Sequence, residues 1–272
     1  VTGFQGVNKY DDYTTLGRGG SDTTAVALAA ALRADACEIY TDVDGVYTAD
    51  PRVVKNARKL KEITYDEMLE LATSGAKVLH NRSVEMAKKY GVQLVVRSSM
   101  NLEEGTTVKE VAKMEKMLIS GVAGDKNTAR ISVLGVSDQP GVAFKIFHTL
   151  AKNNINVDII LQSVGREGTK DISFTVSQED LKPALAILEE YQEPMTIREI
   201  KWEDTVAKIS IVGAGMMSNP GVAAKLFESL YNNGININMI STSEIRITVL
   251  IDEKEIDKAM QAVHDGFGLG DV

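Results

Sequence analysis

The sequence predicts an α/β protein in which a mostly parallel sheet domain precedes two ferredoxin-like βαββαβ units. Two observations carry this prediction. Up to about residue 107, short strand-like runs alternate with amphipathic helices. From about residue 116 the chain repeats itself: "ISVLGVSDQPGVAFKIFHTLAKNNINVDIILQS" at 131–163 resembles "ISIVGAGMMSNPGVAAKLFESLYNNGININMISTS" at 209–243.

Several classes of protein are disfavoured by composition. The 272 residues carry a formal charge of −8, which disfavours nonspecific binding to nucleic acid. No apolar run approaches the length of a membrane span. The single cysteine, Cys37, argues against a disulfide framework and favours a reducing cytosol. With three scattered histidines, the chain predicts neither a zinc site nor a Ser-His-Asp nucleophile.

The first domain is expected over residues 1–107. Its strand-like runs are "VTGFQGV" (1–7), "CEIYTDV" (37–43) and "QLVVRSS" (93–99). Its helix-like runs are "AVALAAALRA" (25–34), "TYDEMLELATS" (64–74) and "NRSVEMAKKYG" (81–91). The polar segment "NLEEGTTVKEVAKMEK" (101–116) is expected to be a linker.

Each repeat follows the order β-α-β-β-α, and the first ends with a fourth strand, "MTIREIKWE" (195–203). The second repeat has no fourth strand after its last helix. We expect the strand-like segment 116–124 to supply it, because a missing strand would leave an unpaired edge. The first unit (128–204) is then inserted within the second (116–124 plus 205–272).

The first motif is "GRGGSD", residues 17–22, ahead of an alanine-rich helix. Its glycines permit a tight turn, Ser21 or Asp22 can cap the helix, and the helix N-terminus attracts anions. Arg18 adds a bidentate fork for a carboxylate or phosphate. The spacing fits neither the dinucleotide fingerprint nor the Walker loop, and an ordinary turn with a capped helix explains the same residues.

Two further segments carry polar groups. In "YTDVDGVYTADPR" (40–52), a strand runs into Thr41 and Asp42, Tyr47 offers a flat face for a base, and Arg52 offers charge for phosphates. An ordinary surface loop also accounts for this segment. In "SGAKVLHNRSVEMA" (74–87), a solvated lysine and a structural His80 are the plain interpretation.

These segments, followed by "VVRSSMNLEEGT" and the doubled module, together resemble aspartokinase over essentially the whole chain. The resemblance implies an amino-acid-kinase domain, two ACT domains that bind amino acids, and transfer of the ATP γ-phosphoryl group to the β-carboxylate of L-aspartate. That reaction opens the pathway to lysine, threonine and methionine. By resemblance, Arg18 and Ser21 bind substrate and Asp22 acts at the transfer site. The implied site for ATP with Mg²⁺ comprises Thr41, Asp42, Tyr47, Asp50, Arg52 and Lys77.

The repeats suggest a regulatory site of their own. Gly141 follows a proline and exposes backbone N–H groups at a helix start, which suits an amino-acid carboxylate. Asp158 could receive a cationic group or an α-ammonium. By resemblance, lysine or threonine, or both, bind at Asp138, Gly141, Val142, Ala143, Asn156, Val157, Asp158 and Gln162 in the first copy, and at Val222, Ala223, Asn236, Ile237, Ser243 and Glu244 in the second.

The chain departs from the family pattern at its front. The family's "KFGG"-like or "KYGG"-like segment, with the lysine that stabilises the transferring phosphoryl group, is not present, so this piece alone is expected to be inactive. A homodimer through the ACT domains, or a heterotetramer with a regulatory subunit, is expected. Two alternatives remain: another amino-acid kinase (glutamate, acetylglutamate or uridylate kinase), and a regulatory amino-acid-binding protein without catalysis.

Overall fold

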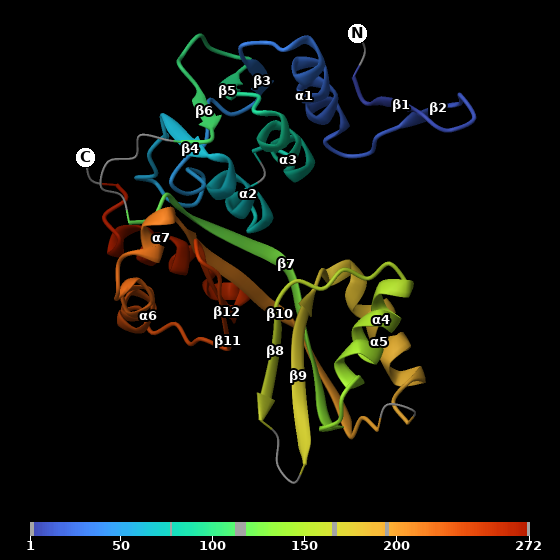
Figure 1. The fold of residues 1–272 in the computed structure, drawn as a ribbon. Helices are drawn as coiled ribbons and strands as arrows, with labels where there is room; N and C mark the ends of the chain where they lie inside the picture. The colour runs from blue at the N-terminus through green and yellow to red at the C-terminus, as the bar shows by residue number, and fades with distance from the viewer. Residues whose placement is uncertain (1–2, 77, 112–117, 165–167, 194–195, 271–272) are drawn as a thin grey trace.

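The computed structural model describes residues 3–76, 78–111, 118–164, 168–193 and 196–270. They form a hairpin, a four-stranded sheet and a six-stranded sheet (Figure 1). The expected mixed α/β class, with a sheet containing parallel strands followed by antiparallel repeats, is confirmed.

The N-terminal region holds three helices and six strands in its described residues. Their bounds are β1 Gln5–Val7, β2 Tyr13–Thr15, α1 Gly20–Leu32, β3 Cys37–Thr41, β4 Glu62–Thr64, α2 Tyr65–Thr73, α3 Asn81–Tyr90, β5 Leu94–Ser98 and β6 Thr106–Lys109. The sheet order is β3-β5-β6-β4, with parallel β3–β5 and β4–β6 pairs and an antiparallel β5–β6 pair.

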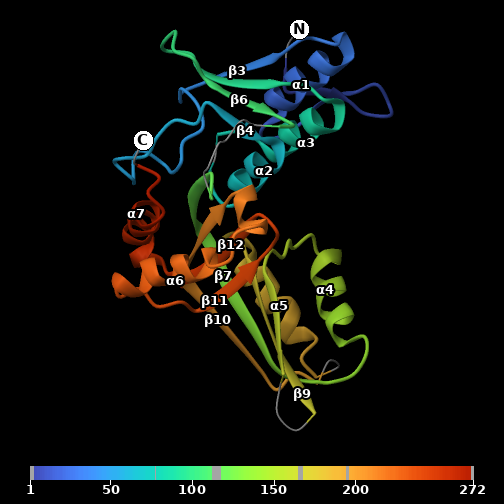
Figure 2. The same cartoon turned by 60° about the vertical axis from the view of Figure 1, so that its left-hand side comes forward.

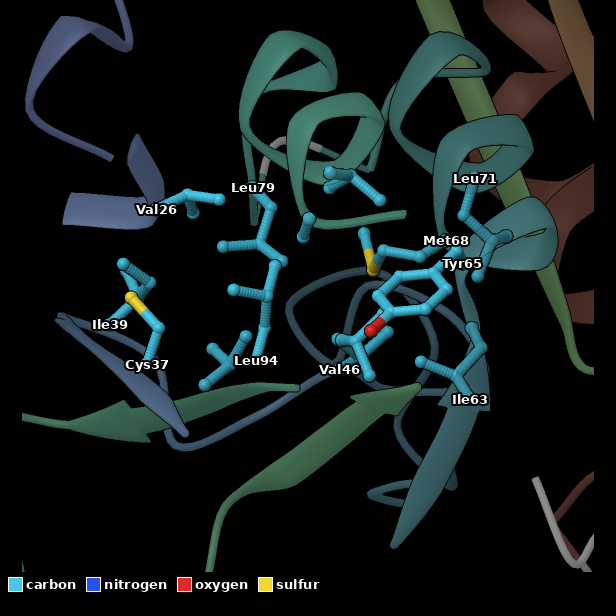
Figure 3. Packing of buried hydrophobic residues seen from close by; sticks show 14 of the residues in the cluster. Val26, Cys37, Ile39, Val46, Ile63, Tyr65, Met68, Leu71, Leu79 and Leu94 are labelled. Atoms are coloured by element: carbon cyan, nitrogen blue, oxygen red, sulfur yellow. The ribbon is translucent and has the colours of Figure 1, made fainter. Parts of the chain in front are cut away.

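The core of this region lies between the sheet and its helices. Figure 3 shows Val26, Leu79 and Leu94 in this core together with Tyr65, whose hydroxyl donates to the Val92 carbonyl at 2.8 Å. The same cluster includes Ala123 and Val212 from the C-terminal half, so the two halves share buried surface.

Two expectations for this region were wrong. Residues 106–109 were expected to be linker, yet they form β6, because Thr106 and Val108 point into the interior and Val108 joins the core. The expected strand 1–7 is short: residues 5–7 pair with 13–15 as a hairpin. Residues 1 and 2 lie outside the described part of the chain.

The C-terminal half is built on one antiparallel sheet of order β11-β12-β10-β7-β9-β8. Its elements are β7 Gly121–Ser137, α4 Val142–Lys152, β8 Ile160–Val164, β9 Thr169–Val176, α5 Gln178–Glu190, β10 Glu199–Val212, a 3-10 turn Ala214–Met217, α6 Val222–Asn232, β11 Met239–Thr242, β12 Arg246–Asp252, a 3-10 turn Glu253–Glu255 and α7 Ile256–Gly266. Figures 1 and 2 show α4 and α5 on one side of β7 and β10, and α6 and α7 on the other.

The two long strands β7 and β10 run through both repeats. Residues 121–124 pair with 209–212 in the second repeat, whereas 130–134 pair with 199–203 in the first. The pairing expected for segment 116–124 is therefore seen for residues 121–124; residues 116 and 117 lie outside the described part. The fourth strand of the first repeat was expected to be separate from the first strand of the second. Instead they form one strand, β10, with register shifts between Glu203 and Lys208, because no glycine or proline interrupts "EDTVAKI".

Each repeat has its own buried cluster, and a small third cluster joins them. Ile146 and Phe174 are central in the first repeat, and Ile209 and Val263 in the second. Ile159, Val206, Met239 and Leu250 form the joining cluster. Among the described residues, no helix combines the length and hydropathy that a membrane span requires.

Candidate functional site

The glycine-rich loop turns into α1 earlier than expected. Gly17 and Gly19 have φ of 75° and 72°, and Gly19 is the N-cap residue of a helix that begins at Gly20. Ser21 and Asp22 therefore lie in the first helical turn, and no side chain caps the helix. The expected cap at Ser21 or Asp22 was wrong, because two glycines in the left-handed region let the chain enter the helix directly.

Helix α3 fixes the position of this loop. A Cβ atom at Gly19 would collide with the ring of His80, which itself caps α3 by accepting from the Arg82 N–H at 3.3 Å. Arg82 Nη2 donates to the carbonyls of Leu16, at 2.7 Å, and Arg18, at 3.3 Å. His80 is structural, as expected, whereas the role of Arg82 was not predicted from the sequence.

The polar side chains of the loop remain accessible. Arg18 and Ser21 are exposed and Asp22 is half-buried. Arg18 has no ion pair with another described residue, and Ser21 Oγ lies 3.5 Å from Asp22 Oδ1. A free guanidinium at a helix N-terminus can bind an anionic ligand.

The second predicted group lies where the parallel strands end. β3 ends at Thr41 and the parallel β5 at Ser98, and the Ser99 N–H donates to the Thr41 carbonyl at 2.8 Å. Asp42 is exposed and accepts from the Thr41 hydroxyl at 2.9 Å. Only residues 33–36 connect α1 to β3, so the two run antiparallel and the N-terminus of α1 points toward this edge. Ser98 and Ser99 belong to the edge but were not predicted as site residues.

Tyr47 is half-buried and its hydroxyl is engaged. The hydroxyl donates to Asp44 Oδ1 at 2.9 Å, and Lys59 Nζ donates to Asp44 Oδ2 at 3.1 Å. Burial alone would raise the pKa of Asp44, but these hydrogen bonds hold that pKa below its ordinary value. Burial and the neighbouring carboxylate raise the pKa of Tyr47. The Asp44 ion pair thus orients the tyrosine.

Arg52 forms a two-point pair with Asp50. Its Nε and Nη2 donate to Oδ1 and Oδ2 at 3.0 and 2.7 Å, and hydrogen bonding from Arg52 lowers the pKa of Asp50. The Arg52 side chain is 87% exposed, and no hydrogen bond from Nη1 to a described residue is formed. One edge of the guanidinium is therefore free for a phosphate.

A magnesium nucleotide would require oxygen ligands from the chain. Asp42 and Asp50 supply carboxylates, but the described residues hold no group of three or more metal-ligating side chains. A magnesium ion bound mainly by nucleotide phosphates needs only one or two protein carboxylates, so the set fits. Lys77, the expected phosphate ligand, lies outside the described residues.

The two repeats present the same turn at equivalent places. Gly141 and Gly221 are the N-cap residues of α4 and α6, each has φ of 94°, and a Cβ at either would meet nothing within 4 Å. Each turn therefore leaves open space at a helix N-terminus, where N–H groups can meet a carboxylate.

The expected acidic effector residues are both paired within the chain. Asp138 lies 2.7 Å from Lys170, and Asp158 lies 2.6 Å from Lys208 of the second repeat. Asn156, Gln162, Asn236, Ser243 and Glu244 are exposed; Val142, Ala143, Val157, Ala223 and Ile237 are half-buried; Val222 is buried. Asp158 is consequently not an open site for a cation.

The division into an N-terminal sheet domain and two repeats agrees with two family models. The amino acid kinase family model matches residues 1–98, and the ACT domain model matches residues 131–192 and 209–267.

The chain belongs to the aspartokinase family. It is 53% identical over 270 residues to an aspartokinase of Bacillus sp. strain MGA3, covering 99% of this chain but 66% of that relative. Two structures of E. coli aspartokinase III, one with aspartate and ADP and one with lysine and aspartate, match at 31% and 30% identity with TM-scores of 0.83 and 0.76; each comparison covers 97% of this chain and 59% of the other. A structure of aspartokinase alpha and beta subunits matches at 51% identity and a TM-score of 0.52, covering 55% of this chain and 99% of the other.

Proposed function

We propose that the protein containing this chain is an aspartate kinase that transfers the γ-phosphoryl group of ATP to the β-carboxylate of L-aspartate. One observation carries the proposal: the glycine-rich loop before α1 and the polar groups after β3 and β5 share one edge of a sheet in a chain 53% identical to an aspartokinase. The relative solved with aspartate and ADP supports the substrate pair.

The chain's residues would position two anions. Arg18 would hold a carboxylate of aspartate, with Ser21 and Asp22 beside it in the first turn of α1. Tyr47 would stack on the base, and Thr41, Asp42 and Arg52 would meet the phosphates with Asp50 orienting Arg52. Mg²⁺ would neutralise charge on the phosphate oxygens. Because aspartate's carboxylate is already ionised at neutral pH, the site needs no strong base.

The regulatory proposal rests on the paired turns at Gly141 and Gly221. Each would bind the carboxylate of lysine or threonine, with Asn156 and Asn236 meeting the polar groups of the effector. The relative solved with lysine supports an amino-acid effector. Calorimetric titration with lysine and with threonine tests this; no heat from either would contradict it.

Assembly is proposed through the outer strands of the six-stranded sheet. β8 and β11 are its edges, and Ile160 and Ile240 on them are 49% and 40% exposed. A second copy, or a separate regulatory subunit as in the alpha–beta aspartokinase, would cover these edges. The free, buried Cys37 supports a cytosolic setting.

The catalytic proposal is tested on the full-length protein by following ADP formation. Arg18→Ala should raise the KM for aspartate about 10- to 100-fold, the loss of a charge-assisted hydrogen bond, and leave the KM for ATP nearly unchanged. Arg52→Ala should raise the KM for ATP and leave the KM for aspartate nearly unchanged. Arg33→Ala, at the other end of α1, is the control. An unchanged KM for aspartate in Arg18→Ala would remove the substrate assignment.

A further inference from the structure

The segment between β3 and β4, which carries the proposed nucleotide residues, lies beside α7 of the second repeat (Figures 1 and 2). Its centre is Thr48, which is fully buried. Thr48 Oγ1 lies 2.9 Å from His264 Nε2 on α7, and the Thr48 carbonyl accepts from the Val122 N–H of β7 at 2.7 Å. Two elements of the regulatory half therefore hold the residue next to Tyr47.

The rest of the segment is anchored to the second repeat. Ala49 and Val54, 4% and 0% exposed, belong to the hydrophobic cluster of the second repeat. Around them, Arg58 Nε donates to the Leu269 carbonyl at 2.6 Å, and Asn56 Nδ2 donates to Asp265 Oδ1 at 2.9 Å. This segment therefore belongs to the N-terminal region in sequence and also packs into the hydrophobic cluster of the second repeat.

The hydrogen-bond pattern favours one tautomer of His264. Thr48 Oγ1 already accepts from the Arg58 N–H at 2.9 Å, so its own O–H is available to donate to Nε2 when that nitrogen carries no proton. In this tautomer Nδ1 carries the proton; it has no hydrogen-bond partner among the described residues and lies 3.8 Å from Asp265 Oδ1. The ring is 0% exposed.

We propose that His264 is a positioning residue for the nucleotide loop, residues 44–58. Neutral His264 accepts a hydrogen bond from Thr48 and holds this loop in place. Protonation of the ring releases the loop. The inference rests on the proposed function for the role of the loop. Protonation would place N–H on Nε2 facing the Thr48 hydroxyl, whose own proton would then have no acceptor among the described residues. Asp265 and Arg58 are the charged groups that face the ring, and they act in opposite directions. Burial keeps the pKa of His264 below its ordinary value, so the neutral form prevails near pH 7.

The test uses hydrogen exchange in the full-length protein, reported as protection factors so that the intrinsic pH effect is removed. The probes are the amides of Leu60 and Val54, which bond the Val46 and Asp50 carbonyls; the Ile155 amide in the first repeat is the reference. Thr48→Val should lower loop protection about tenfold at pH 8, and Thr48→Ser, which keeps the hydroxyl, should retain it. The wild type should lose loop protection between pH 8 and pH 5, and His264→Gln should show no such change.

A second measurement separates this inference from the proposed function. The dissociation constant of Mg-ATP should rise about tenfold in Thr48→Val and not in Thr48→Ser. Equal loop protection in Thr48→Val and the wild type, or the same pH dependence in His264→Gln, would overturn the positioning role. Loop opening with unchanged Mg-ATP affinity would overturn the link to the nucleotide. Failure of every form to bind Mg-ATP would instead contradict the proposed function, with hydrogen exchange still deciding whether His264 holds the loop.

Discussion

Lys208 on β10 forms an ion pair with Asp158, its Nζ 2.6 Å from Oδ2, and lies 3.4 Å from Asp125 Oδ2 on β7. The Lys208 side chain is 10% exposed. Asp158 belongs to the first repeat and Lys208 to the second, so the pair joins the two ACT units beside the small cluster that contains Ile159 and Val206. An effector ammonium at Asp158 would have to compete with Lys208.

Asp158→Ala should destabilise the chain by about 1–3 kcal/mol, because it leaves a largely buried ammonium with one weaker partner. The matched control is Asp138→Ala: Asp138 also pairs with a lysine, Lys170 at 2.7 Å, but the carboxylate is 50% exposed, and the cost should stay below about 1 kcal/mol. Urea unfolding measures both. Equal losses would show that burial of Lys208 does not matter.

Glu67→Ala should be among the more costly substitutions at the junction of the two halves. Glu67 is 2% exposed and accepts from the Ser120 hydroxyl at 2.5 Å, the Ala214 N–H at 3.1 Å and the Thr64 hydroxyl at 2.8 Å. Removing the carboxylate leaves the buried Ser120 hydroxyl and two partly buried donors without an acceptor, and we expect a loss of about 3–5 kcal/mol in the free energy of unfolding.

The control for Glu67 is Glu85→Ala on α3, where the side chain is exposed. Its effect should stay within about 0.5 kcal/mol. A small effect at Glu67 as well would mean that water replaces the carboxylate, and the junction would be less tightly built than described.

Gly17→Ala tests backbone strain alone in the glycine-rich loop, whereas Gly19→Ala tests backbone strain together with a steric collision. Both residues have positive φ, which costs a non-glycine residue about 1 kcal/mol. At Gly17 an added Cβ meets nothing within 4 Å, whereas at Gly19 it collides with His80, which adds about 1–3 kcal/mol. In thermal unfolding, the Tm of Gly19→Ala should be well below the Tm of Gly17→Ala. The reverse order would contradict the packing of His80 on the loop.

Stability should depend on pH through His264. Burial lowers the folded-state pKa of His264 below the value of about 6.5 that an unfolded chain shows. Between those two values the unfolded state binds more protons, so the free energy of unfolding falls as pH falls through that window and is fully retained above it. His264→Gln should flatten the curve there, and His148→Gln, at an exposed position, should not. A curve unchanged by His264→Gln would refute the assignment.

Local sequence patterns predicted much of the fold. The alternation of strands and helices, the repeat at 131–163 and 209–243, and the pairing of 121–124 with 209–212 all follow from periodicity and from the need to fill a sheet edge. Strand β6 was mistaken for linker because four residues, "TTVK", carry too short a pattern among charged neighbours. The cap of α1 was misplaced because sequence does not show which glycines adopt positive φ.

The prediction of site residues was limited because the sequence does not show which side chains pair with one another. Arg18, Tyr47 and Arg52 could be chosen by residue type and motif, but their partners could not. Asp44 holds Tyr47, Asp50 holds one edge of Arg52, and Lys208 lies 50 positions from Asp158. The last of these pairs depends on how distant strands register, which no local pattern encodes.

By itself, the sequence determined the class of domains, their order, the presence of turns at its glycine-rich segments and the residue types available for anions and amino acids, because these depend on local propensity and short spacing. Only the tertiary structure decided that β7 and β10 run through both repeats and that Thr48 meets His264, 216 positions away along the chain. Contacts of that kind arise when buried surfaces pack and their polar atoms must find partners, a condition set by the whole fold.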